Sequence, residues 1–130
     1  MSSGTFQAPG GVALAGEWQR VDVAASLTDS ALTINGISTA TQRGAPFEMR
    51  AVGISLSGST AATGANLTCA LWIDGVVTSL VGTLIAGQTI GFGHGDVTIR
   101  SSGVYELKIT TPGGWTSTTL DLVASLFTAP

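Results

Sequence analysis

The sequence LTCALWIDGVV, residues 67–77, decides the fold class of this chain. Every second position of its first seven residues is apolar, which is the two-residue period of a β-strand with one buried face. These positions are Leu67, Cys69, Leu71 and Ile73. Asp74-Gly75 follows directly, and both residues tolerate the positive φ angles of a tight hairpin turn. The stretch therefore predicts a strand, a turn and a return strand from Val76 towards Leu84.

The same period returns in residues 47–57 and in residues 105–110. It predicts an inward-facing apolar set on these two strands: Val52, Ile54, Leu56, Tyr105, Leu107 and Ile109. The opposite face of the second strand carries Glu106, Lys108 and Thr110, which we expect to face solvent. Gly53 interrupts the first strand and marks a bulge or a close approach of another backbone.

Other parts of the chain are less regular. Residues 120–127 are apolar on both faces, which indicates a last strand in a central position or against a neighbour. Residues 91–96 alternate glycine with other residues and are expected to form a loop. Two short strands are expected at residues 18–23 and 32–34, and Ala86-Gly87 is expected to break the chain after residue 84.

Seven to nine short strands separated by turns, without a convincing capped helix, predict an all-β fold. The expected architecture is an antiparallel two-sheet β-sandwich that is jelly-roll-like. A chain of 130 residues suits one hydrophobic core. The glycine- and alanine-rich opening predicts a flexible N-terminal arm over residues 1–16, followed by a single β-sandwich domain over residues 17–130.

The charge pattern argues against a nucleic-acid partner. The net charge is −3, and the five basic residues form no run or stripe, whereas phosphate binding needs clustered cations. No stretch approaches the roughly 18 consecutive apolar residues of a membrane-spanning helix, and the first 11 residues lack the pattern of a secretory signal. We therefore expect neither a nucleic-acid nor a membrane partner, and synthesis in the cytoplasm.

The inventory of titratable residues is thin for catalysis. His94 and Asp96 are the best pair, because alternate strand positions point two ligands, or an acid and a base, to one side. No third ligand accompanies them, so no catalytic residue, metal site or cofactor is expected. Cys69 lies within an apolar alternation and is expected to be a small core residue rather than a reactive thiol.

Four aromatic residues are the candidate partner contacts: Trp18, Trp72, Trp115 and Phe127. The three tryptophans lie beside polar or turn residues rather than inside apolar runs. Such a tryptophan fills a second core layer, packs against a subunit, or stacks on a sugar ring. All three alternatives stay open from the sequence.

Three stretches together resemble the small β-sandwich virion proteins of tailed bacteriophages: residues 49–57, residues 69–75 and residues 114–122. This family includes head-decoration (cement) proteins, head fibres and tail-tip or fibre domains, and the likeness covers about residues 47–127. Proteins of this family are commonly trimeric. The resemblance brings no catalytic motif to this chain. The chain shows no heptad or repeat-rich shaft, which favours the compact decoration type.

The resemblance implies a non-enzymatic structural protein on the outer surface of a phage capsid. Its partners would be further copies of itself, as a homo-oligomer and most simply a trimer, and the major capsid protein. Residues 1–16 would help anchor it. Two alternatives stay open: a receptor- or glycan-binding module at a tail tip or fibre, which uses Trp72 or Trp115, and a hydrolase or metal-dependent enzyme, which uses His94 and Asp96.

Overall fold

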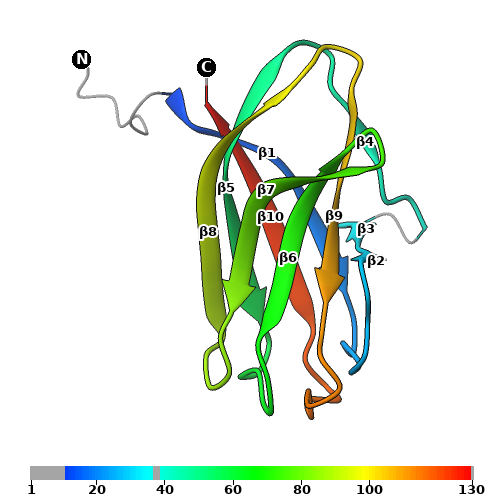
Figure 1. Cartoon of the computed structure of the whole chain (residues 1–130), viewed down its shortest axis with the longest axis vertical. Helices are drawn as coiled ribbons and strands as arrows, with labels where there is room; N and C mark the ends of the chain where they lie inside the picture. Colours follow the sequence, from blue (N-terminus) through cyan, green and yellow to red (C-terminus); the bar gives the residue numbers. More distant parts are fainter. Residues whose placement is uncertain (1–10, 37–38, 130) are drawn as a thin grey trace.

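Ten antiparallel β-strands make up the regular structure of residues 11–36 and 39–129, the part of the chain that the computed structural model describes (Figure 1). No α-helix occurs within these two ranges. The strands are β1 (Ala13–Arg20), β2 (Ser30–Ala31), β3 (Thr33–Ile34), β4 (Arg43–Gly44), β5 (Met49–Gly58), β6 (Leu67–Ile73), β7 (Val76–Leu84), β8 (Ile90–Ile99), β9 (Val104–Thr110) and β10 (Leu122–Ala129).

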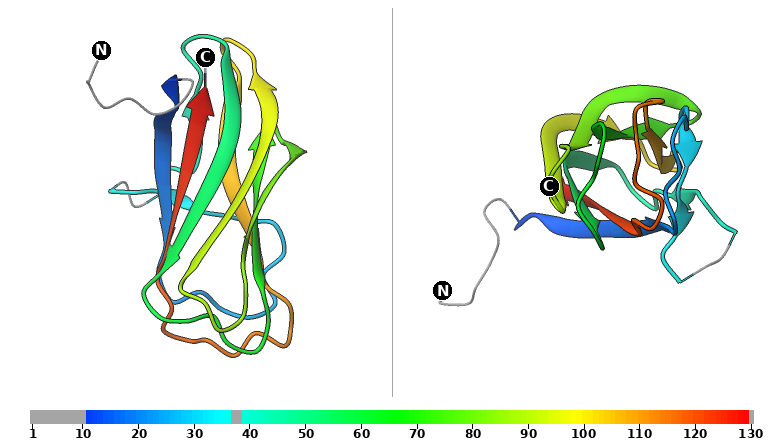
Figure 2. Two further views of the ribbon diagram at one scale, coloured as in Figure 1. Left: turned by 90° about the vertical axis from the view of Figure 1, so that its left-hand side faces the viewer. Right: turned by 90° about the horizontal axis from the view of Figure 1, so that it is seen from below.

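The strands follow the spatial order β2-β9-β6-β7-β8-β5-β10-β1-β3, with β4 also paired to β9. One layer contains β9, β6 and β7, and the other contains β8, β5, β10 and β1. The layers are joined at the β7–β8 corner, where Thr83 and Phe92 form the registered pair. Figure 2 shows the two layers folded around a common interior. The expected two-sheet antiparallel β-sandwich is confirmed in this form.

The expected β6–β7 hairpin is confirmed at both strands and at the turn. Asp74 has a φ of 51° and Gly75 a φ of 79°, the pair of positive values that a type I′ turn requires. Ile73 pairs with Val76 on either side of the turn. Asp74 also accepts a hydrogen bond on Oδ1 from the backbone N–H of Val104 at 2.9 Å, so this hairpin is tied to the start of β9.

The central position expected for the last strand is also confirmed. β10 pairs with β1 on one side and with β5 on the other. Its buried face carries Leu122, Ala124 and Leu126. A strand with neighbours on both edges leaves no backbone groups unpaired at its centre, which explains how so apolar a segment is accommodated.

The expected loop at residues 91–96 is wrong, because this segment is the middle of the ten-residue strand β8. Gly91 and Gly93 lie where the β7 backbone approaches β8. A Cβ atom at Gly93 would overlap the carbonyl oxygen of Val81, and one at Gly91 would overlap that of Thr83. The glycines are therefore required for close passage of two strands at the corner of the sandwich, and not for turning the chain.

The bulge expected near Gly53 is present, and it turns the preceding residue, Val52, away from the inward face that the alternation predicts. Relative to β10, β5 carries one extra residue between Ala51 and Gly53, because Thr128 pairs with Ala51 and Phe127 with Gly53. The register of β5 with β8 also shifts between Ala51 and Gly53. An extra residue in one strand shifts the alternation by one position. Ala51 is consequently buried beside Ile54, whereas Val52 is only partly buried, so its inward assignment is wrong.

The polar face of β9 does not simply face solvent. Glu106 is 6% exposed and accepts a hydrogen bond from the amide Nε2 of Gln42 at 3.1 Å. The segment that contains β4 pairs along β9 at Tyr105 and Val104 and covers this face. The expectation of a solvated Glu106 was wrong because the covering segment lies more than 60 residues away in the sequence.

The expected boundary between arm and domain at residue 16 is also wrong. β1 begins at Ala13, and its registered pairing with β10 starts with Ala13 opposite Thr128. Residues 13–16 therefore belong to the sandwich. Residues 1–10 lie outside the described part of the chain, so the expected arm stays a prediction for them.

A single cluster of buried side chains fills the space between the layers. Its largest fully buried members include Trp18 together with leucine and isoleucine side chains from both layers. Cys69 is completely buried within it, as expected, and burial raises the pKa of its thiol to about 12. The thiol is therefore protonated and shielded in the folded chain.

Candidate interaction surface

Trp18 and Trp115 are core residues, which corrects their assignment as partner contacts. Trp18 is fully buried and donates from its indole N–H to the carbonyl oxygen of Thr41 at 2.8 Å. Trp115 is 3% exposed and donates to the carbonyl oxygen of Val23 at 3.1 Å. Both have polar sequence neighbours because loops from elsewhere in the chain fold over them, and neither has surface to offer a partner.

Trp72 lies on the outer face of β6, where its ring is partly buried. It pairs across the sheet with Val77, and the ammonium Nζ of Lys108 lies 4.2 Å from its ring centroid. A cation over an aromatic face is attracted by the ring quadrupole, so this side of the ring already has a partner. The indole N–H of Trp72 is buried without a hydrogen-bond acceptor.

Phe127 lies on the outer face of β10 in the other layer, between Leu14 of β1 and Gly53 of β5. Its side chain is partly buried. Trp72 and Phe127 therefore belong to opposite layers. The structure does not bring the four candidate aromatic residues together into one contact site.

The outer face of the β7–β8 corner carries a different set of exposed apolar side chains. We call it the β7–β8 strip; it comprises Val77, Val81, Ile85, Ile90 and Phe92. Ile90 is 66% and Phe92 is 71% exposed. The register Thr83 opposite Phe92 brings the two strands side by side, and Val77 extends the strip to Trp72 on β6.

Sequence reasoning missed the β7–β8 strip for two reasons. The segment that holds Phe92 was assigned to a loop, so its outward direction in a strand was not considered. β7 also carries apolar residues on both faces, with Leu80 and Leu84 buried and Val81 outward. Apolar residues on both faces of β7 are the sequence feature that could have indicated the β7–β8 strip, because one of the two faces must then lie outside the core.

His94 and Asp96 do lie on one side of β8, as the alternation predicts, but Asp96 is already engaged. Arg50 on β5 donates to Asp96 from Nε at 3.1 Å and from a terminal nitrogen at 2.8 Å. These hydrogen bonds lower the pKa of Asp96 and raise that of Arg50. The pair is solvent-exposed and adds little to stability.

The described residues contain no group of three or more His, Cys, Asp or Glu side chains positioned to hold a metal ion. In the same part of the chain no helix is long and apolar enough to span a membrane.

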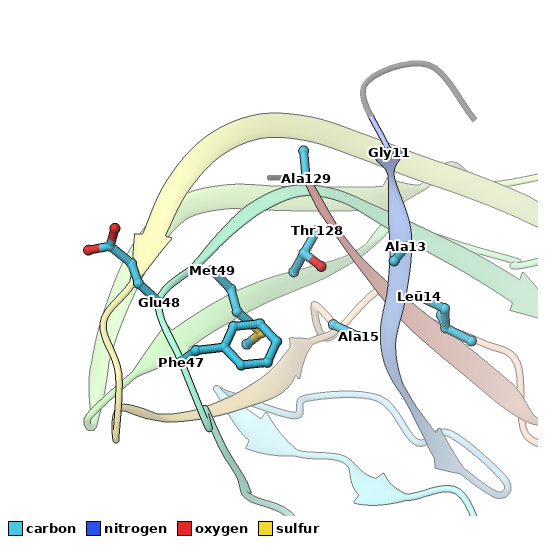
Figure 3. Close-up of a pocket in the computed structure, with 9 residues that line it drawn as sticks. All are labelled: Gly11, Ala13, Leu14, Ala15, Phe47, Glu48, Met49, Thr128 and Ala129. Atoms are coloured by element: carbon cyan, nitrogen blue, oxygen red, sulfur yellow. The ribbon is translucent and has the colours of Figure 1, made fainter. Parts of the chain in front are cut away.

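A groove of about 320 Å³ lies where the starts of β1 and β5 meet the end of β10 (Figure 3). We call it the β1–β5 groove. Phe47 and Met49 extend from the β5 side, and Ala13 and Leu14 line the opposite side. Phe47 is 63% exposed and Leu14 is 54% exposed. Glu48 is the charged residue among those that line the groove.

Comparison with known proteins adds evidence on the fold. No family model and no curated protein matches the sequence. Among solved structures, the globular domain of zebrafish complement 1qA protein is similar, with 13% sequence identity and a TM-score of 0.50. The match covers 85% of this chain and 93% of that chain. At this identity the likeness shows the fold alone, and the chain is an all-β sandwich of the jelly-roll type.

Proposed function

We propose that this chain is a non-enzymatic structural protein of a bacteriophage virion, a decoration (cement) protein that binds the outside of the head and stabilises it. In this proposal it is made in the host cytoplasm and resides on the capsid surface. Its partners are further copies of itself, as a trimer, and the major capsid protein. The virion assignment is supported by the resemblance in residues 49–57, 69–75 and 114–122.

The observation that carries the proposal is the β7–β8 strip. Ile90 and Phe92, which are 66% and 71% exposed, lie two positions apart on β8, beside the exposed valines of β7. Exposed apolar side chains grouped in this way are typical of a surface that is covered in an assembly. Burying one such side chain contributes about 1.5–3 kcal/mol. Only 5 basic and 8 acidic residues occur in the chain, which suits a surface that is consumed in contacts. A protein that binds only the assembled lattice adds its binding free energy to that lattice.

The test adds the purified protein back to shells that lack it and measures the temperature at which the shells disrupt. We compare the wild type with Phe92→Lys in the β7–β8 strip and with Val21→Lys as a matched control, since Val21 is 63% exposed but lies beyond the end of β1. Wild type and Val21→Lys should raise the disruption temperature, and Phe92→Lys should not. If the wild type gave no protection against heat or chelation, the cement role would be wrong.

A glycan-binding module of a tail tip or fibre is the second candidate, and it is favoured by the partly exposed ring of Trp72. Trp115 no longer supports it, because that side chain is buried. Lys108 occupies one face of Trp72, so in this proposal a sugar would stack on the other face. Binding to a glycan array that Trp72→Ala abolishes and Val21→Lys retains would favour this function over the cement role.

A further inference from the structure

We propose that the β1–β5 groove is the docking site for the N-terminal segment of the same chain, residues 1–10, with the Phe6 side chain as the anchor. Those residues lie outside the described part, so only their sequence enters the argument. The lining residues named above and Gly11, where the segment joins them, belong to the described residues. The inference does not depend on the proposed capsid role.

The chemistry of the groove matches an uncharged, apolar occupant. Its walls come mainly from alanine, leucine, phenylalanine and methionine side chains, with Glu48 as the charged member. Residues 1–10 contain no charged side chain, and their large apolar residues are Met1 and Phe6. An aromatic ring that enters the groove would cover Phe47, which is otherwise 63% exposed.

The attachment point of the segment restricts where it reaches. Gly11 and Ala13 are themselves part of the groove wall. Phe6 precedes Gly11 by five residues, which span at most about 18 Å when fully extended. A side chain tethered this closely has a high effective concentration at the groove, and a free ligand or a second copy must compete with it.

The backbone at the junction favours a reversal of the chain. Gly11 has a φ of 71°, a left-handed conformation that glycine adopts at no steric cost. It follows Pro9-Gly10, a dipeptide that is typical of turns. Beyond it, β3 pairs with β1 at Trp18 and Gln19, and the side chains of Tyr105 and Arg43 reach Ala15 and Gly16. Within the described chain, the edge of β1 at Ala13 and Leu14 has no strand partner on that side. A segment that turns back at Gly11 would shield this edge.

Methionine NMR provides a direct test on the isolated 130-residue chain, because it has two methionines and Met49 lines the groove. With ¹³C-methyl methionine, we expect a nuclear Overhauser effect between the Met49 methyl and the Phe6 ring. Phe6→Ala should abolish it and move the Met49 resonance. Phe92→Ala, which removes an exposed ring elsewhere, should leave Met49 unchanged.

Hydrogen exchange supplies a second readout with a conservative rescue. Phe6→Ala should accelerate exchange of the backbone amides of residues 13–15 by about tenfold, because loss of the anchor releases the segment. Phe6→Leu should retain most of the protection, since leucine still fills the groove. An unchanged Met49 resonance and unchanged exchange in Phe6→Ala would overturn the proposal.

A contact seen only between differently labelled chains in a mixed sample would also overturn it, and would assign the groove to a second copy. None of these measurements uses capsids. Failure of the shell-stabilisation experiment and failure of the docking experiment are therefore separate results.

Discussion

The indole N–H groups of Trp115 and Trp72 are both buried, but only that of Trp115 has a hydrogen-bond acceptor. The sequence around the two residues did not distinguish them. Trp115 donates to the carbonyl oxygen of Val23 inside the core. The Trp72 indole nitrogen is buried and has no acceptor. A buried donor without a partner costs free energy, and a satisfied one contributes modestly to stability. The difference makes the two residues a matched pair for mutagenesis.

Trp115→Phe should lower the free energy of unfolding by about 1–3 kcal/mol, because it leaves the Val23 carbonyl without its donor and shrinks a buried ring. Trp72→Phe should change it by less than about 1 kcal/mol. Phenylalanine attracts the Lys108 ammonium less strongly than tryptophan does, but the substitution also removes the buried N–H that has no acceptor, and the two effects offset each other. Urea unfolding followed by circular dichroism measures both. Equal destabilisation by the two substitutions would contradict the assigned environments.

At the level of the elements, the long strands were predictable and their surroundings were not. β6 and β7 begin and end at the residues expected from the alternation and from Asp74-Gly75. β8 was missed, because the alternating glycines that resemble a loop in the sequence serve the crossing of β7. Local periodicity reports the conformation of a segment, and it carries no information on how closely a distant backbone passes.

Gly93 and Gly95 test this explanation as neighbours on the same face of β8. Gly93→Ala should destabilise the fold by at least about 1–3 kcal/mol, because its Cβ would overlap the carbonyl oxygen of Val81. Gly95→Ala should be neutral or slightly stabilising, since the nearest atom is Cδ1 of Leu80 at 3.5 Å, an ordinary contact. Thermal unfolding of the two variants provides the comparison. The crossing would be excluded as the cause if Gly95→Ala were the more harmful change.

For the whole molecule, one continuous core joins both layers, and this predicts a single cooperative unfolding transition. Cys69 and the buried tryptophans report on it independently. Labelling of the Cys69 thiol at pH 8 and tryptophan fluorescence should give the same urea midpoint, because the thiol is reached only after the core opens. Labelling at clearly lower urea would show that β6 opens separately from the rest.

The same thiol predicts a dependence of stability on pH. Burial raises the pKa of Cys69 in the folded chain to about 12 from an ordinary value of 9.0. The unfolded chain therefore releases this proton first as the pH rises. The stabilisation is fully present below pH 9 and is lost progressively between pH 9 and pH 12. A Cys69→Ala variant should lose this component of the pH dependence in urea titrations.

The sequence by itself determined the fold class, the long strands around residues 49–58, 67–84 and 104–110, and the tight turn at Asp74-Gly75. These features depend on side-chain alternation and on turn geometry, which act between residues close in the chain. Only the tertiary structure decided that Trp18 and Trp115 are buried, that Glu106 is covered and that Phe92 is exposed. Burial is set by which distant segment covers a strand, and no local pattern encodes that choice.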